Sequence, residues 1–190
     1  MLERVISAEH FLEGVFAVLK NPDALPGVLD ELPAPVYLTD ASGFVTHFNQ
    51  ACIGFSGRKP LAGKDRWCVT WKLFSEAGEA LPHDQCPMAD TVRSREKIRG
   101  VTAYAERPDG TRVQFMPFPT PIFSEDGEFQ GAVNLLIDIT EKEQARDLRE
   151  QAARCRRLAT ASGDAQLCKT LNRLASQYEV KAIAIDLLPA

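Results

Sequence analysis

The sequence lacks several features that would assign it to an enzyme or membrane class. It has no Gly-rich phosphate-binding loop, no nucleophile elbow and no His-Glu-x-x-His metal motif. No apolar run approaches the ~20 residues needed to span a bilayer. The N-terminus has no basic start followed by an apolar stretch, so we expect no signal peptide. These absences argue against a catalytic role and against a membrane location.

Basic charge and paired cysteines are also missing. The formal net charge is −4, whereas unaided nucleic-acid binding depends on basic surface that displaces counterions. The five cysteines form no CxxC pair and no regular spacing. They are typical of reduced thiols rather than of a disulfide framework or a structural zinc site. We therefore expect a cytoplasmic protein with no direct nucleic-acid partner.

The most informative segment joins an apolar run to a charged one. Residues 131–139 are rich in Val, Ile and Leu, which favours a buried strand, and residues 141–150 favour a helix. Asp138 and Thr140 stand at the junction, where a short polar side chain can cap a helix. Because no Gly or Pro separates the two elements, strain in a sheet can pass into the helix. This arrangement suits a sensor better than a catalyst.

Hydrophobic patterning predicts a mixed α+β domain, consistent with 45% hydrophobic and 25% charged residues. A first hairpin is expected at 36–39 and 44–48, followed by a helical insert that includes a helix over 88–94. Three further strands are expected at 101–106, 112–118 and 129–139, separated by the turn signals of residues 107–111 and 123–128.

Helices are predicted on both flanks of this domain. Residues 3–20 have one apolar face. After Thr140, a weakly apolar heptad seam predicts either a coiled coil or a folded-back helical hairpin; its members are Ala145, Leu148, Ala152, Cys155 and Ala159. A break at 162–164 precedes a second amphipathic helix, whose apolar face is predicted to contain Leu167, Leu171, Leu174 and Tyr178.

Several of these motifs together resemble a PAS domain. The opening half is carried by Leu32-Pro-Ala-Pro-Val-Tyr-Leu-Thr-Asp-Ala-Ser-Gly43 and Asn49-Gln-Ala51. The closing half is carried by Arg107-Pro-Asp-Gly-Thr111, Pro121, Asp126-Gly127, Gly131 and Asp138-Ile-Thr140. The stretch Leu81-Pro-His-Asp-Gln-Cys-Pro-Met88 resembles one found in PAS modules of bacterial sensor kinases.

The resemblance implies a five-stranded antiparallel sheet with helices on one face, flanked by N- and C-terminal helices. The expected organisation is an N-terminal helical cap at 1–29, a PAS domain at 30–140 and a C-terminal helical segment at 141–190. That last segment is too short for a kinase or cyclase core. It resembles the short helical tails of some bacterial signalling proteins, which act in signalling or dimerisation.

Ligands of PAS domains lie between the sheet and the helices, so the resemblance suggests a set of pocket-lining side chains. The alternative is that these residues simply fill the core. The tryptophans offer flat area with a polar N–H that suits a planar ligand. The candidates are Trp67, Trp71, Phe74, Met88, Val92, Phe115, Leu135 and Ile137.

Cys86 and His83 form the sharpest chemical hypothesis. A thiolate at a Cys-Pro pair can ligate haem iron, and a histidine three residues earlier can supply a nitrogen ligand. The alternative is a loop and helix start in which Cys86 packs and His83 is solvated. A lone Cys-Pro is a weak motif, so we expect no cofactor, with haem as the second possibility. Asn49 is interpreted as a turn or helix cap.

The sequence thus predicts a non-enzymatic bacterial signal-transduction protein. A small ligand or a partner would bias the PAS domain, and Asp138, Ile139 and Thr140 would pass its state to the C-terminal helices. We expect a homodimer acting on a separate signalling protein, such as a two-component sensor kinase or a regulator. Two alternatives remain: a haem-based redox or gas sensor using Cys86 and His83, and an interaction adaptor that binds no ligand.

Overall fold

The computed structural model describes residues 12, 29–30, 32, 34–162 and 164–186. The helix predicted at 3–20 therefore lies, apart from Leu12, outside the described residues. The chain divides into two compact units, residues 1–138 and residues 139–190. Among the helices of the described segments, none combines the length and the apolar character that crossing a membrane requires.

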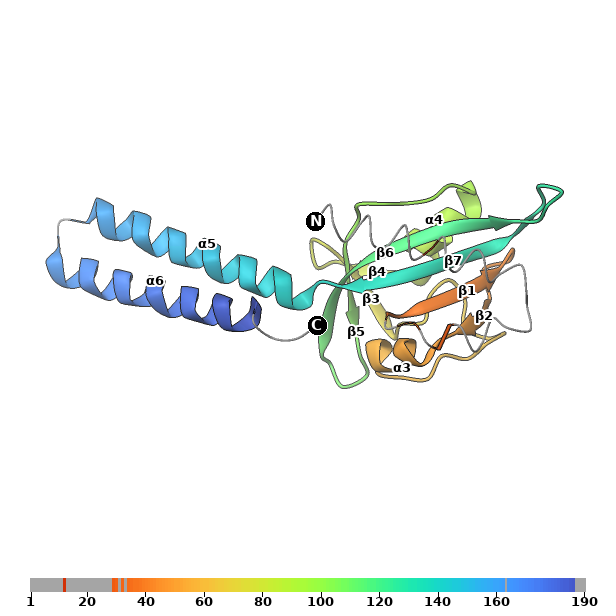
Figure 1. Cartoon of the computed structure of the whole chain (residues 1–190), viewed down its shortest axis with the longest axis horizontal. Helices are drawn as coiled ribbons and strands as arrows, with labels where there is room; N and C mark the ends of the chain where they lie inside the picture. Colours follow the sequence, from red (N-terminus) through yellow and green to blue (C-terminus); the bar gives the residue numbers. More distant parts are fainter. Residues whose placement is uncertain (1–11, 13–28, 31, 33, 163, 187–190) are drawn as a thin grey trace. The chain divides into compact units, whose positions relative to one another are not determined.

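A single antiparallel sheet organises the first unit (Figure 1). Its strand order is β2-β1-β7-β6-β5-β3-β4, so the first and last strands of the unit are central neighbours. The strands are β1 (Val36–Asp40), β2 (Val45–Phe48), β3 (Lys72–Ser75), β4 (Ala80–Leu81), β5 (Ala103–Glu106), β6 (Arg112–Phe123) and β7 (Phe129–Asp138).

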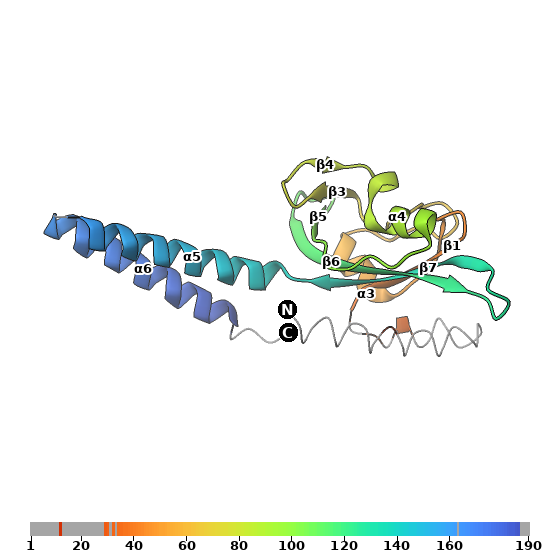
Figure 2. The ribbon, with the colours of Figure 1, turned by 90° about the horizontal axis from the view of Figure 1, so that it is seen from above.

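Two short helices and a 3-10 turn connect β2 to β5: α3 (Gln50–Ser56), η1 (His83–Gln85) and α4 (Pro87–Ser94). Asn49 caps α3 by accepting a hydrogen bond from the backbone N–H of Cys52, as predicted. Cys86 caps α4, and Pro87 occupies its first turn, where the missing N–H costs nothing. Both helices contribute buried side chains to one core against the same face of the sheet; Figure 2 shows α4 on that face.

Strand alternation separates two cores on the two faces of the sheet. On β7, Ala132 and Leu136 face the helices, whereas Val133 and Leu135 face the other way. We call the first cluster the inner core and the second the outer core. The outer core includes Leu12 and Leu29, so the N-terminal part of the chain contributes to covering that face. Both faces of β7 are buried, which explains its nearly continuous apolar sequence.

The sheet has more strands than predicted. The hairpin β3–β4 falls in the region predicted to hold only helices and loops; its strands are too short for a clear alternation, and Gly78 turns between them with φ of 81°. Strand β6 continues beyond the predicted end at 118, despite the three prolines at 117, 119 and 121. The carbonyl of Pro119 accepts from the N–H of Ile98, away from β7. A proline has no N–H group. At these positions that group would point away from β7, so the pairing between β6 and β7 is kept.

The second unit is a helical hairpin formed by α5 (Thr140–Ala161) and α6 (Ala165–Asp186). Of the two arrangements left open by the sequence, the folded-back hairpin is observed. The predicted seam of α5 faces α6, with Ala145, Ala152 and Ala159 fully buried. On α6 the buried positions are Ala175 and Ala182, whereas Leu167, which we predicted on the apolar face, is 47% exposed. Alanines at heptad spacing allow the two helices to approach closely, which moves Leu167 to the edge.

Candidate functional site

The structure places the eight predicted pocket residues in three environments. Met88, Val92 and Phe115 belong to the inner core, and Trp67 packs against it. Leu135 and Ile137 lie in the outer core, on the opposite face of the sheet. The remaining two, Trp71 and Phe74, lie beside a surface hollow near the end of the sheet. The structure therefore does not bring the eight residues together in one pocket.

The space between helices and sheet is occupied by buried side chains. Phe115 from β6 meets Phe55 from α3 edge to face, with ring centroids 5.3 Å apart. Met88 and Cys52 are almost fully buried beside them. Close packing of this kind stabilises the domain through dispersion and burial of apolar surface. The residues in this space act as core residues in the described structure.

Trp67 is held in a strained conformation at the boundary of the inner core. Its φ of 70° is rare for a residue with a side chain. Its ring lies over Gly43, and the guanidinium of Arg66 lies 4.4 Å from the ring centroid. Its carbonyl accepts a hydrogen bond of 3.0 Å from the hydroxyl of the buried Tyr37. Trp67 is thus committed to local packing and does not share a ligand with Trp71.

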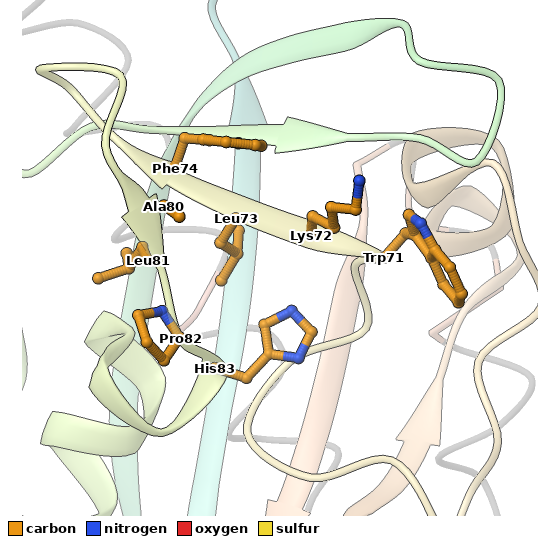
Figure 3. A pocket seen from close by; sticks show the side chains of 8 residues that line it. All are labelled: Trp71, Lys72, Leu73, Phe74, Ala80, Leu81, Pro82 and His83. Atoms are coloured by element: carbon orange, nitrogen blue, oxygen red, sulfur yellow. The ribbon is translucent and has the colours of Figure 1, made fainter.

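The surface hollow lies beside β3, β4 and η1 (Figure 3). Figure 3 shows that Leu73 and His83 lie on one side of β3, and that Lys72 and Phe74 point to the other side. The volume of the hollow is about 290 Å³, and it opens broadly to solvent. Trp71 is 52% exposed at its border. The guanidinium of Arg112 lies 3.9 Å from the ring centroid of Phe74, on the side of β3 away from His83, whereas the indole of Trp71 is half-exposed on the side of the hollow.

Cys86 has a structural role in the described chain. Its Sγ accepts a hydrogen bond of 3.5 Å from the N–H of Ala89 at the start of α4, and the side chain is 2% exposed. Burial raises the pKa of the Cys86 thiol above its ordinary value, and its place among the buried residues of the inner core leaves no open side for a haem. This environment does not fit a haem ligand.

His83 stands on the wall of the hollow rather than in solvent. Its Nε2 lies 3.4 Å from the hydroxyl oxygen of Thr70. Burial and the nearby Arg58 lower the pKa of His83 below its ordinary value, so the imidazole is neutral at pH 7. Within the described ranges, no group of three or more His, Cys, Asp and Glu side chains is arranged to hold a metal ion.

The predicted relay residues lie where the two units join. Strand β7 ends at Asp138, and α5 begins at Thr140. The N-cap position is Ile139, which supplies no side-chain hydrogen bond; the expected capping by Asp138 or Thr140 stays a prediction. A single residue nevertheless separates strand from helix.

Sequence reasoning missed the buried polar side chains of the inner core. Tyr37, Thr70 and Asn134 are at most 2% exposed. The amide of Asn134 donates to the hydroxyl of Tyr37 at 3.0 Å and accepts from the N–H of Phe118 at 3.0 Å. An asparagine inside the apolar run 131–139 is the one signal that pointed to this network, because an amide in a buried strand requires partners.

No family model and no curated protein matches the sequence. Solved structures are similar to it at low identity. An RNA-binding Light-Oxygen-Voltage receptor is 17% identical with a TM-score of 0.48, covering 66% of this chain and 34% of its own, so this chain spans about a third of that receptor. The Rhodobacter sphaeroides LOV protein is 13% identical with a TM-score of 0.47, covering 90% of this chain and 99% of its own.

The PAS domain of Bordetella pertussis BvgS is 19% identical with a TM-score of 0.42, covering 67% of this chain and 94% of its own. With TM-scores below 0.5 and identities below 20%, these likenesses carry no argument of their own. The antiparallel sheet of the first unit, with its first and last strands as central neighbours and its helices packed on one face, is a PAS-type fold. The predicted α+β fold class is therefore confirmed.

Proposed function

We propose that this chain is a signal-transduction protein, in which the PAS-type domain senses a small ligand or a partner and the α5–α6 hairpin carries its state onward. The observation that supports the proposal is the junction at Ile139. One non-glycine, non-proline residue separates the central strand β7 from the long helix α5. The backbone has no flexible spacer there that would absorb a change in the strand.

Strand β7 is well placed to collect changes in the sheet. It pairs with β1 over residues 131–135 and with β6 over almost its whole length. A ligand or partner that prefers one arrangement of the sheet shifts the population of that arrangement. Coupling between two sites of a protein is typically worth about 1–3 kcal/mol.

The transfer of a change from the PAS-type domain to α5 is tested by hydrogen–deuterium exchange, with one substitution in the core and one insertion at the junction, alone and combined. Val92→Ala perturbs the inner core, and a Gly-Gly insertion between Ile139 and Thr140 introduces a flexible joint. We expect Val92→Ala to change the exchange rates of α5 amides in the native background and to leave them unchanged in the insertion background. Exchange in β7 serves as the control that the core perturbation is present in both. If α5 is insensitive to Val92→Ala while β7 responds, the relay is wrong.

The proposed homodimer is supported by the two unlike edges of the hairpin. On one edge, ion pairs join the helices: Arg149 with Asp186, and Arg156 with Glu179 at 2.7 Å. By heptad position, Leu158 and Leu167 lie on the opposite edge, where they are 51% and 47% exposed. We assign this leucine edge to contact with a second copy of the chain, because leucines from both helices form a self-complementary apolar surface.

Sedimentation tests the dimer. The double variant Leu158→Glu/Leu167→Glu should be monomeric at concentrations where the native chain is dimeric. Leu61→Glu is the matched control, since Leu61 is 50% exposed in the PAS-type domain. A native chain that sediments as a monomer at high micromolar concentration contradicts the proposal. The released hairpin surface would then act on a separate signalling protein, such as a sensor kinase or regulator.

A second candidate function is an interaction adaptor that binds no ligand. The filled inner core favours it, because the usual ligand space of a PAS domain holds side chains such as Phe55 and Phe115. A thermal-shift screen of metabolites distinguishes the two functions, since any ligand that binds only the native state raises the melting temperature.

A further inference from the structure

We propose that the hollow beside Trp71 and His83 is a binding site for a small, neutral, planar aromatic molecule, and that a buried chain of polar side chains reports its occupancy to β7. The site stands on its own geometry, whereas the reporting step rests on the proposed function.

The hollow has the composition of a small-molecule site. Its volume of about 290 Å³ is near the lower end of the range for ligand pockets. Apolar side chains of Leu73, Leu81 and Pro82 form its walls (Figure 3). The half-exposed indole of Trp71 offers a flat face against which an aromatic ring can stack. A planar ligand is therefore the shape that covers the most exposed apolar surface.

The polar group of the hollow selects a neutral ligand. The imidazole of His83 is uncharged at pH 7 and contacts Thr70 through Nε2 only. Within the described residues, its other ring nitrogen has no hydrogen-bond partner. A ligand with one N–H or hydroxyl group can form a hydrogen bond with that nitrogen. Arg58 and Asp65 nearby already pair with each other at 2.8 Å, so a charged ligand would find no free counter-charge in that pair.

A continuous buried chain leads from this wall into the domain. The hydroxyl of Thr70 lies 3.1 Å from the Sγ of Cys68. Cys68 directly follows Trp67, whose carbonyl accepts a hydrogen bond from the hydroxyl of Tyr37 at 3.0 Å, and the amide of Asn134 donates to that same hydroxyl at 3.0 Å. Each of these four side chains is at most 4% exposed. Because these groups are buried, a change in the direction of one hydrogen bond alters the strength of the neighbouring one, since no water replaces a lost partner.

The chain ends on the strand that precedes α5. Asn134 lies on β7, four residues before its end at Asp138, and also accepts from the backbone of β6. A ligand bonded to His83 fixes the direction in which the imidazole donates and accepts. That choice constrains the hydroxyl of Thr70 and, through the chain, the strength of the hydrogen bond that the Asn134 amide donates to Tyr37.

Indole is the probe for the site, because it is neutral and planar and carries one N–H. Nuclear magnetic resonance of the full chain should show saturable shifts of the Leu73 and Leu81 methyl groups on titration with indole. Trp71→Ala should weaken binding at least about tenfold, and Phe123→Ala, which truncates another exposed aromatic outside the hollow, should leave it unchanged. Cyclohexanol, apolar and not planar, should bind more weakly than indole. Absence of saturable methyl shifts, or equal binding by Trp71→Ala, overturns the site.

The reporting chain is tested by cutting it at two points with isosteric changes. In Thr70→Val and in Tyr37→Phe, indole should still cause saturable shifts of the Leu73 and Leu81 methyl groups, but the shift of the Asn134 side-chain amide on binding should disappear. A shift that persists in both variants overturns the chain and leaves the site intact. If Val92→Ala alters α5 exchange while indole causes no change at the hollow, this inference fails and the proposed function stands. If indole shifts Asn134 but α5 never responds, only the proposed function fails.

Discussion

Gly43 lies directly beneath the ring of Trp67: a Cβ added at residue 43 would stand 2.0 Å from Cζ3 of the indole. The hairpin turn between β1 and β2 therefore has both a left-handed residue, with φ of 85°, and a contact that excludes any side chain. The turn packs against the strained Trp67, whose carbonyl accepts a hydrogen bond from the hydroxyl of Tyr37. The glycine in the Asp-Ala-Ser-Gly motif is thus required by tertiary packing as well as by turn geometry.

Gly43→Ala should destabilise the domain more than a matched glycine change. Gly110 has the same φ of 85° but open space around it, so Gly110→Ala measures the backbone cost alone. We expect Gly43→Ala to lower the free energy of unfolding by about 1–3 kcal/mol more than Gly110→Ala, the usual cost of overpacking. Chemical denaturation of both variants provides the measurement. Equal losses would show that the ring of Trp67 moves away at little cost.

Asn49→Ala should remove a buried connection between the start of β1 and α3. The Asn49 amide accepts from the N–H of Val36 at 3.0 Å and donates to the carbonyls of Leu29 and Ala34 at 3.0 and 2.8 Å. Leaving such groups unpaired costs about 1–3 kcal/mol, which should appear as a lower denaturation midpoint. Gln50→Ala, at the exposed neighbouring position, is the control. A midpoint unchanged by Asn49→Ala would mean that water replaces the amide.

The stability of the first unit should depend on pH through His83. Burial and Arg58 lower its pKa below the ordinary value of 6.5, outweighing Asp65 and Asp84, which raise it. Between the two pKa values the unfolded chain binds more protons than the folded one. The free energy of unfolding should therefore fall as the pH drops from 6.5 towards the lowered pKa of His83. His83→Gln should flatten this dependence. Identical pH profiles for native chain and His83→Gln would contradict the shift.

The five thiols should react in two classes. Burial raises the pKa of Cys52 to about 12 and also raises the pKa of Cys68 and Cys86. Cys155 and Cys168, in the hairpin, are partly exposed. Because the thiolate is the reactive form, dithionitrobenzoate should modify the hairpin cysteines first, and the other three only on unfolding. Cys155→Ser/Cys168→Ser should abolish the fast phase. Rapid modification of Cys86 in the folded chain would mean that the inner core opens readily.

Much of this architecture was readable from local patterns. Alternation and turn residues predicted β1, β2 and β5–β7, because a strand with one or two buried faces has a distinct apolar pattern. The heptad of alanines predicted that α5 packs along one seam. The same patterns did not indicate β3 and β4; β3 pairs with β5, a strand that lies more than 20 residues further along the chain, and β4 pairs only with β3 at the edge of the sheet. Short edge strands have too few residues to show a period.

By itself, the sequence determined β1, β2, β5, β7 and the start of β6, the turns between them, and that strand β7 runs into a polar helix. Only the tertiary structure decided which side chains share a space. It put Leu135 on one face of the sheet and Leu136 on the other, and it brought Tyr37 to Asn134 across 97 residues. Local propensity acts over a few neighbouring residues, whereas a binding site is a meeting of distant ones. The hollow beside Trp71 and His83 is lined by one segment, residues 71–83, yet its shape depends on the pairing of β3 with β5, which no local pattern indicated.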